Sequence, residues 1–243
     1  MTPTKQSSRP TPTPNRPMHR AIAELVAILA PPACCACGRP APAADEPLCG
    51  ACRRDLPWLR GPRCPRCALP APCAPCPASR LAFDAAWAPV AHSGSARAAV
   101  RALKFHGRLA LADAMVAQLA AGAPRVLLDA ADAIVPVPPD RGRARRRGFD
   151  PAALLARGLA RRTGLPLAPC LCRAGRAPRQ VGARARDRRA AGRLHVEATG
   201  PAPKRALLVD DVHTTGATLH ACARALRAAG ALRVAAITYS RAL

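Results

Sequence analysis

The chain has 243 residues, half of them apolar but only 2% aromatic, which allows one medium-sized domain with a core of Ala, Leu and Val plus a small appendage. A net charge of +24 and an isoelectric point near 11.4 favour polyanionic partners: nucleic acid, phosphorylated substrates or anionic membrane, although the arginine-rich, Ala- and Pro-rich composition also indicates compositional bias. The longest apolar segment near the start, Ala21–Ala30, is too short to cross a bilayer and contains Glu24, so we expect no transmembrane segment.

Composition divides the chain into three parts. Residues 1–20 are Pro, Thr, Ser, Asn and basic residues, which is typical of a disordered basic tail. Residues 21–78 combine a short helix, Ala21–Ala30, with a cysteine-rich segment. Residues 79–243 carry the strand and helix patterns of an α/β domain. We expect a cytoplasmic protein, in which cysteines stay reduced and paired C-x-x-C spacings indicate metal rather than disulfides.

Nine of the twelve cysteines fall between Cys34 and Cys76. Each C-x-x-C turn brings two thiolates to one tetrahedral centre, and two turns complete a closed, structural Cys₄ zinc site. Four turns therefore predict one or two zinc ions. Sequential pairing is the simplest arrangement, a crossed pairing stays open, and Cys35 is an alternative to Cys34; free thiols or disulfides are the other interpretation, above all for the second set. The predicted ligands are Cys34, Cys37, Cys49 and Cys52, then Cys64, Cys67, Cys73 and Cys76.

The first part of the α/β region predicts strands followed by two helices. Residues 81–92 read as one or two strands with Trp87 as a large core residue, and a helix begins at Ser95. It is interrupted near His106-Gly107, and a second helix runs to about Ala121. Lys104 lies at the break, where it is either a solvated helix end or a phosphate ligand.

A second buried strand, Ala133–Val137, leads into a strongly basic stretch. Five arginines fall between Arg141 and Arg147, at the carboxyl end of the strand. Guanidinium groups bind phosphate oxygens in pairs, so this loop predicts a pyrophosphate site, with a solvated basic loop or a nucleic-acid patch as alternatives. Pro151–Ala160 then reads as a helix that Asp150 caps.

Eight arginines lie between Arg173 and Arg193, without a clear period. A long basic loop of this kind is a candidate lid that closes over a charged ligand, or a track for a nucleic-acid backbone.

The stretch 206–219, ALLVDDVHTTGATL, is the most informative part of the sequence. An apolar run predicts a buried strand ending at Asp210 and Asp211, a small hydroxyl-rich turn follows, and a helix runs to Ala229 before the strand Val234–Tyr239. The first turn of a helix offers unpaired N–H groups, and small residues let a phosphate approach them. We therefore predict a phosphate cradle formed by Thr214, Thr215, Gly216, Ala217 and Thr218.

Like charges repel, so the two aspartates suit a sugar diol or a water-bound Mg²⁺ better than the phosphate itself. A sugar phosphate with free neighbouring hydroxyls fits both halves. The alternatives are a solvated acidic pair at a strand end, or a receiver-type acid pair that binds Mg²⁺ for phosphorylation.

Residues 206–218 resemble the thirteen-residue signature of the type I phosphoribosyltransferases, which bind phosphoribosyl pyrophosphate (PRPP). From about Cys34 onward the chain resembles the competence protein F (ComF) family, through the C-x-x-C turns, L-K-F-H-G at Leu103–Gly107, I-V-P-V-P at Ile134–Pro138 and R-G-F-D at Arg147–Asp150. The chain departs from the family pattern at Asp150, Ala177 and Ala191.

The resemblance implies a type I phosphoribosyltransferase-like fold over 79–243, PRPP bound with Mg²⁺, and a role in DNA uptake during natural transformation, with a possible partner in the uptake machinery. Asp210 and Asp211 would take the ribose hydroxyls. The turn 214–218 would take the 5′-phosphate. The implied pyrophosphate ligands are Lys104, Arg141 and Arg147, and the implied lid residues are Gln180 and Arg188.

Three functions remain open from the sequence. The first is a phosphoribosyltransferase that acts on an unknown acceptor. The second is a non-catalytic module that senses PRPP or binds single-stranded DNA through its arginines, with zinc as a scaffold. The third is a purely structural relative, against which the intact acidic pair and T-T-G-A-T turn argue.

Overall fold

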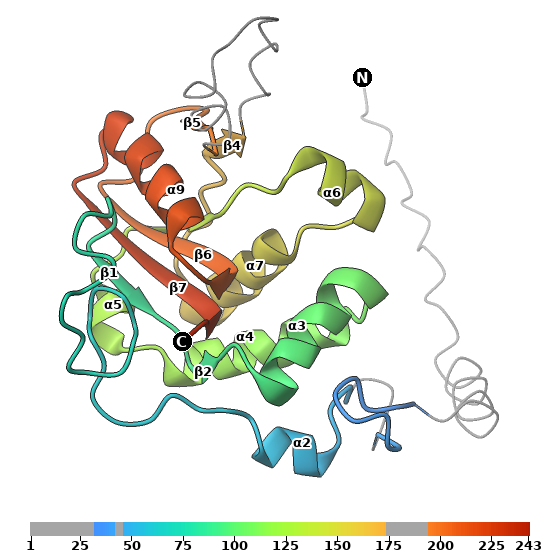
Figure 1. The fold of residues 1–243 in the computed structure, drawn as a ribbon. Coiled ribbons are helices and arrows are strands. Elements are labelled where there is room, and N and C mark those ends of the chain that lie inside the picture. Colours follow the sequence, from blue (N-terminus) through green and yellow to red (C-terminus); the bar gives the residue numbers. More distant parts are fainter. Residues whose placement is uncertain (1–31, 42–45, 174–193) are drawn as a thin grey trace, which may run out of the picture.

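The computed structural model describes residues 32–41, 46–173 and 194–243 (Figure 1). The predicted tail, the predicted helix Ala21–Ala30 and most of the predicted lid lie outside these residues. The elements, in chain order, are α2 Gly50–Arg54, β1 Ala85–Trp87, β2 Val90–Ala91, α3 Gly94–His106, α4 Ala110–Gly122, α5 Arg125–Asp129, β3 Ala133–Pro136, α6 Arg141–Arg147, α7 Pro151–Thr163, β4 Leu171–Arg173, β5 Val196–Ala198, β6 Arg205–His213, α9 Ala217–Ala228 and β7 Arg233–Arg241.

A parallel sheet forms the centre of the molecule. Its strands follow the order β1-β7-β6-β3, and β2 pairs with β7 beyond the end of β1. The longest pairing joins β6 to β7, from Arg205 opposite Arg233 to His213 opposite Arg241. Both strands are buried along most of their length, as strands covered on two faces must be. The predicted α/β class, a parallel sheet flanked by helices and preceded by a small cysteine-rich segment, is confirmed.

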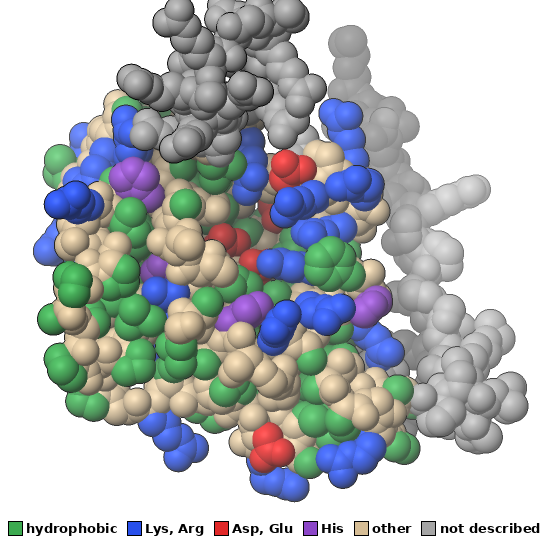
Figure 2. Space-filling model, viewed as in Figure 1, with side chains coloured by type: hydrophobic (Ala, Val, Ile, Leu, Met, Phe, Trp, Pro, Cys, Tyr) green, Lys and Arg blue, Asp and Glu red, His purple; other side chains and the backbone are tan. Residues whose placement is uncertain are grey.

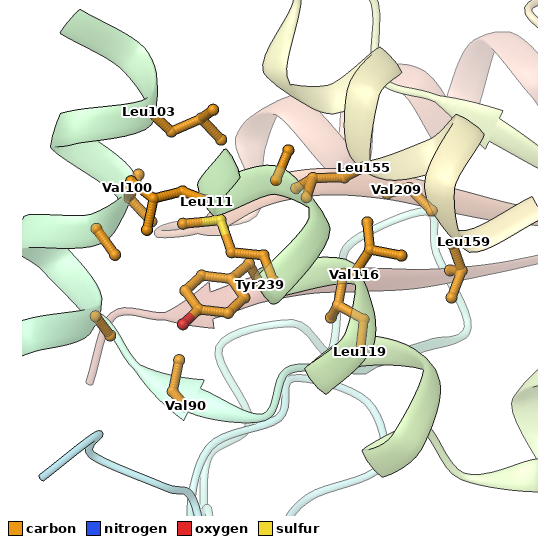
Figure 3. Close-up of a cluster of buried hydrophobic side chains, with 14 of the residues drawn as sticks. Val90, Val100, Leu103, Leu111, Val116, Leu119, Leu155, Leu159, Val209 and Tyr239 are labelled. Atoms are coloured by element: carbon orange, nitrogen blue, oxygen red, sulfur yellow. The ribbon is translucent and has the colours of Figure 1, made fainter. Parts of the chain in front are cut away.

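Two apolar clusters cover the two faces of the sheet. On one face, α3, α4 and α7 pack Leu103, Leu119 and Leu155 against Val209 and Tyr239 (Figure 3). On the other face, α9 packs its own buried leucines against the alternate residues of β6 and β7. The cysteine-rich segment contributes to both clusters: its first part packs on the α3 side and its second part on the α9 side. It is therefore docked closely on the sheet.

Several predicted boundaries are confirmed. The break between the two helices falls at Gly107, which adopts a left-handed conformation with φ of +60°. Asp150 caps α7 by accepting a hydrogen bond from the Ala152 N–H at 3.0 Å, and Pro151 occupies the first turn. β3 ends at Pro136 at the edge of the parallel sheet, where a residue without an N–H is tolerated.

Two predictions were wrong. The strand that leads to the acidic pair does not end there: β6 continues through Asp210 and Asp211 to His213, because β7 runs beside it and pairs with Asp210, Val212 and His213. The basic stretch after β3 is a helix, α6, rather than a loop. Asp140 caps it by accepting from the Arg143 N–H at 3.0 Å, and Gly148 ends it in a left-handed conformation.

A short antiparallel hairpin, β4–β5, lies beside α9 and flanks the undescribed residues 174–193 (Figure 1). Within the described part of the chain, no helix combines the length and apolar character that crossing a bilayer requires.

Candidate functional site

A crevice of about 300 Å³ opens at the carboxyl ends of β3 and β6, the edge where parallel sheets bind ligands. Carboxylates lie in its depth, with basic side chains around them (Figure 2). Its charged and hydroxyl-bearing lining consists of Lys104, Asp140, Arg143, Arg147, Asp150, Arg173, Asp210, Asp211, Thr214 and Thr218. The structure thus brings together the predicted acidic pair, two residues of the predicted cradle and two predicted cationic ligands.

The two adjacent aspartates point to opposite sides of the sheet, as consecutive strand residues do. Asp211 lies on the α3 side, where its Oδ1 is 2.8 Å from the Lys104 ammonium nitrogen, and only 9% of its side chain is exposed. Asp210 lies on the α9 side, where burial and then its carboxylate raise the pKa of the Cys222 thiol. The Asp210 carboxylate also accepts the Asp211 N–H at 2.8 Å. Both side chains still line the crevice.

Negative charge is crowded at the base of this crevice. Burial, followed by the neighbouring Asp211 carboxylate, raises the pKa of Asp210. Burial is also the largest cause that raises the pKa of Asp150, and the Asp211 charge adds to it. Carboxylates in this situation are stabilised by a cation. Their oxygens are of the kind that Mg²⁺ prefers, so the donor set fits a magnesium ion held directly or through water.

The turn between β6 and α9 has the form of an anion cradle. Gly216 adopts φ of +81° and precedes the first residue of α9. The Thr215 hydroxyl accepts from the Ala217 N–H at 3.3 Å, and Thr214 and Thr215 are exposed. Thr214 and Thr218 line the crevice, and the positive end of a twelve-residue helix lies behind them.

Neighbouring side chains also leave no space for a side chain at Gly216. A Cβ built there would lie 2.8 Å from Leu81 Cδ1 and 3.0 Å from His213 Nε2. The left-handed backbone and the close neighbours both require glycine at this position.

The cationic side of the crevice differs from the prediction in detail. Lys104 and Arg147 line it, but Lys104 is paired with Asp211. Arg141 begins α6; its side chain, like Gln180 and Arg188, lies outside what the structure describes.

Sequence reasoning did not single out Arg143 and Arg173, both of which line the crevice. Arg173 also donates from Nε to the Pro138 carbonyl at 3.0 Å. The helical spacing of α6 was the available signal for Arg143, which lies one turn before Arg147.

A second, larger cavity of about 610 Å³ adjoins the crevice and shares Lys104, Arg143 and Arg147 with it. Phe105 lines this cavity with 65% of its surface exposed, and the Arg147 guanidinium stacks over its ring at 5.0 Å. No acidic residue lines this cavity within the described chain.

The cysteines form two clusters. In each, the four sulfur atoms lie within 4.8 Å of one another. The pairing is sequential, Cys34/Cys37/Cys49/Cys52 and Cys64/Cys67/Cys73/Cys76, and Cys35 belongs to neither cluster. A set of four thiols fits zinc and leaves no coordination position for a substrate, so the geometry is that of structural zinc sites.

Comparison with known families agrees with this geometry. Residues 25–84 match the family model of the double zinc ribbon domain. No curated protein matches the chain.

Among solved structures, the chain is similar to a glutamine phosphoribosylpyrophosphate (PRPP) amidotransferase from B. subtilis complexed with ADP and GMP. The sequence identity is 24% and the TM-score 0.36, over 52% of this chain and 26% of that one. The matched part is about a quarter of that enzyme's length, and this likeness carries no function to the present chain.

Proposed function

We propose that the crevice binds Mg²⁺–PRPP and that the protein is a phosphoribosyltransferase acting on an acceptor still to be identified. One observation carries the proposal: an acidic pair and a glycine-based helix start, adjacent in sequence, open into one crevice that is bordered by lysine and arginine. A ligand that fits all three must carry a diol, a terminal phosphate and a second, more highly charged anion. PRPP carries all three on one ribose: the pyrophosphate on C1, the diol on C2 and C3, and the phosphate on C5.

Each part of the crevice has a role in this proposal. Asp210 and Asp211 accept hydrogen bonds from the ribose 2′ and 3′ hydroxyls. Residues 214–218 surround the 5′-phosphate with N–H groups and hydroxyls. Arg143 and Arg147 face the pyrophosphate, together with Lys104, whose charge lies between that anion and Asp211.

In the reaction, the bond between ribose C1 and the pyrophosphate oxygen breaks, and the electron pair leaves with the pyrophosphate. A new bond forms from C1 to the acceptor nucleophile. The arginines stabilise the charge that develops on the leaving group, and the carboxylates hold the ribose as C1 becomes positive. Mg²⁺, when bound, adds further neutralisation of the pyrophosphate.

The resemblance to the ComF family extends the proposal to the role of the protein in the cell. It favours a cytoplasmic protein that acts in DNA uptake during natural transformation, with a partner in the uptake machinery.

Calorimetry with Mg²⁺–PRPP tests the proposal. We expect the double variant Asp210→Asn/Asp211→Asn to lose detectable binding, because both ribose contacts and the acidic environment of the cation are removed. The control Asp113→Asn/Asp129→Asn removes the same charge from exposed positions on α4 and α5 and should bind like the wild type. Equal affinity in all three proteins would contradict the assignment of Asp210 and Asp211 as ligands of the ribose.

The adjoining cavity favours a second candidate, a binding module for single-stranded DNA. An exposed phenylalanine beside Arg143, Arg146 and Arg147 offers a base a ring to stack on and its phosphates several cations. Because the cavity shares Lys104, Arg143 and Arg147 with the crevice, DNA and PRPP would compete for these cations.

An oligo-dT titration at several salt concentrations tests this second candidate. We expect log K to fall steeply with log [salt] and Arg143→Gln/Arg146→Gln to reduce that slope by about 1 to 2. Phe105→Ala should weaken binding by ~1–3 kcal/mol. Leu109→Ala, which removes another exposed apolar side chain next to the same helix break, should not. Weak, salt-insensitive binding would contradict this function.

A further inference from the structure

Arg241, at the end of β7, is a buried arginine that joins the second cysteine cluster to the turn after β6. Only 5% of the residue's surface is exposed, and its Nε donates to the Cys67 carbonyl at 2.8 Å. Its Nη1 donates to the His213 carbonyl at 3.0 Å, to the Thr214 carbonyl at 2.6 Å and to the neighbouring Ala242 carbonyl. An arginine cannot lose its charge, so when buried it depends on these carbonyls for compensation. One guanidinium therefore fixes the cluster backbone and the first residues of the turn relative to each other.

The segment that leaves the second cluster passes directly beneath the same turn. The Phe83 and His213 rings meet edge to face, with centroids 5.7 Å apart. Leu81 and Phe83 also fill the space below Gly216, where an added Cβ would lie 2.8 Å and 3.4 Å from their side chains. The floor of the turn is thus built from residues that follow the last cysteine of the cluster by five and seven positions.

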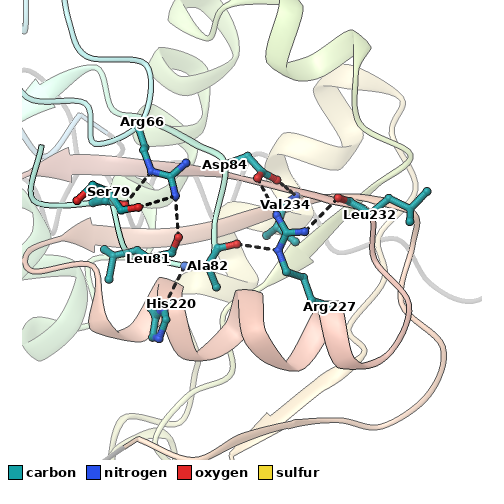
Figure 4. A network of polar contacts seen from close by, with 10 residues as sticks. Arg66, Ser79, Leu81, Ala82, Asp84, His220, Arg227, Leu232 and Val234 are labelled. Carbon is teal, nitrogen blue, oxygen red and sulfur yellow. Dashed lines mark hydrogen bonds and ion pairs between the residues drawn. The ribbon is translucent and has the colours of Figure 1, made fainter.

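Hydrogen bonds hold this segment between the cluster and α9 (Figure 4). Arg66, the residue before Cys67, donates to the carbonyls of Ala78 and Leu81, both at 2.8 Å. The Ala82 N–H then donates to Nδ1 of His220, in the first turn of α9, at 2.9 Å. The path from the cluster to the helix start is continuous.

The first cysteine cluster lies on the other face of the sheet. Cys34 and Cys49 belong to the apolar cluster of α3, α4 and α7. Its neighbouring hydrogen bonds run to that side, for example from Arg108 Nη1 to the Ala33 carbonyl at 3.5 Å. In the described residues, no hydrogen bond joins 32–41 or 46–54 to the turn 213–218.

We propose that the second Cys₄ cluster and Arg241 are positioning elements of the phosphate cradle, whereas the first cluster is not. A metal on Cys64, Cys67, Cys73 and Cys76 would hold the Cys67 carbonyl toward Arg241 and the segment 79–83 beneath Gly216. Loss of that metal releases both supports, and the cradle loses the conformation in which its N–H groups face an anion. The affinity consequence rests on the proposed function; the conformational consequence does not.

Matched variants of the full-length protein test this inference. Cys73→Ser removes a ligand of the second cluster and Cys37→Ser a ligand of the first. Zinc content is measured for each, together with amide hydrogen exchange of peptides covering 213–220 and calorimetric binding of ribose 5-phosphate. We expect both to lose about one zinc. Cys73→Ser alone should speed exchange at 213–220 and weaken ribose 5-phosphate about tenfold, as expected for the loss of about one charge-assisted hydrogen bond.

Arg241→Lys distinguishes the contribution of the arginine from that of the metal. It also tests the inference if Cys73→Ser fails to fold. Lysine keeps the charge but lacks the planar guanidinium that donates to these four carbonyls. We expect full zinc content with faster exchange at 213–220, whereas Arg205→Lys at the far end of β6 should leave that exchange unchanged.

Unchanged exchange at 213–220 in Arg241→Lys, or an equal increase in Cys37→Ser, would overturn the inference. Exchange is measured without ligand. A wild type that fails to bind ribose 5-phosphate would therefore contradict the proposed function and leave this inference standing.

Discussion

Replacing Gly216 with alanine should cost the protein both stability and ribose 5-phosphate affinity. The residue has φ of +81°, which costs an L-residue ~1–2 kcal/mol, and its new methyl would lie 2.8 Å from Leu81 Cδ1. Crowding of this kind adds ~1–3 kcal/mol. We expect the melting temperature to fall by about 5–10 °C. The cradle must also shift to relieve the contact, so ribose 5-phosphate binding should fall below detection in calorimetry.

Gly158→Ala is the matched control. This glycine is in α7, which packs on the face of the sheet opposite α9, and a Cβ there would lie 2.7 Å from Val116 Cγ2. It should lower the melting temperature through crowding but leave the affinity of the folded protein for ribose 5-phosphate intact. If Gly216→Ala bound as tightly as Gly158→Ala, the turn would not be the phosphate site.

The length of β6 illustrates what the residues alone can predict. The apolar run 206–209 was sufficient to predict a buried strand, since four such residues without alternation occur in sheets covered on both sides. Its continuation to His213 depends on β7, a partner whose own polar end, Ser240 and Arg241, gives no strand signal. Pairing with a distant segment overrides local preference at such strand ends.

The same limit applies to α6 and to Lys104. Local signals for α6 were present, with Asp140 as a cap and Gly148 as a stop, but the concentration of arginines suggested a loop. The Lys104–Asp211 pair joins residues more than a hundred positions apart. Only the fold reveals that the predicted pyrophosphate ligand and a predicted ribose ligand already contact each other.

The cysteine sites could be predicted largely from the sequence, whereas the role of Arg241 could not. C-x-x-C spacing predicts pairs of thiols but leaves sequential and crossed pairing open. The fold selects sequential pairing, because each cluster packs on a different face of the sheet. For Arg241 the sequence offers nothing: among 38 basic residues it is distinguished by its burial and by the four carbonyls to which it donates.

Asp210→Asn should stabilise the protein while it weakens PRPP binding, and the size of the stabilisation should depend on pH. Burial and the Asp211 charge raise the pKa of Asp210 to about 8, above the ~3.9 of an unfolded chain. The folded state therefore binds this proton more tightly. Its contribution to stability is complete below about pH 4 and is lost as the pH rises toward 8. Asparagine removes that loss, so the variant and wild type should melt together near pH 4 and diverge as pH increases.

At pH 8 we expect the variant to be more stable by on the order of 1–3 kcal/mol, measured by denaturant unfolding. Asp113→Asn removes the same charge from an exposed position and should follow the wild type at every pH. Mg²⁺ should stabilise the wild type at pH 8 more than Asp210→Asn, because a cation favours the ionised carboxyl that the variant lacks. If the difference in free energy of unfolding between the variant and the wild type stayed constant with pH, Asp210 would already be ionised at little cost. The crowding of charge in the crevice, on which the magnesium site depends, would then be absent.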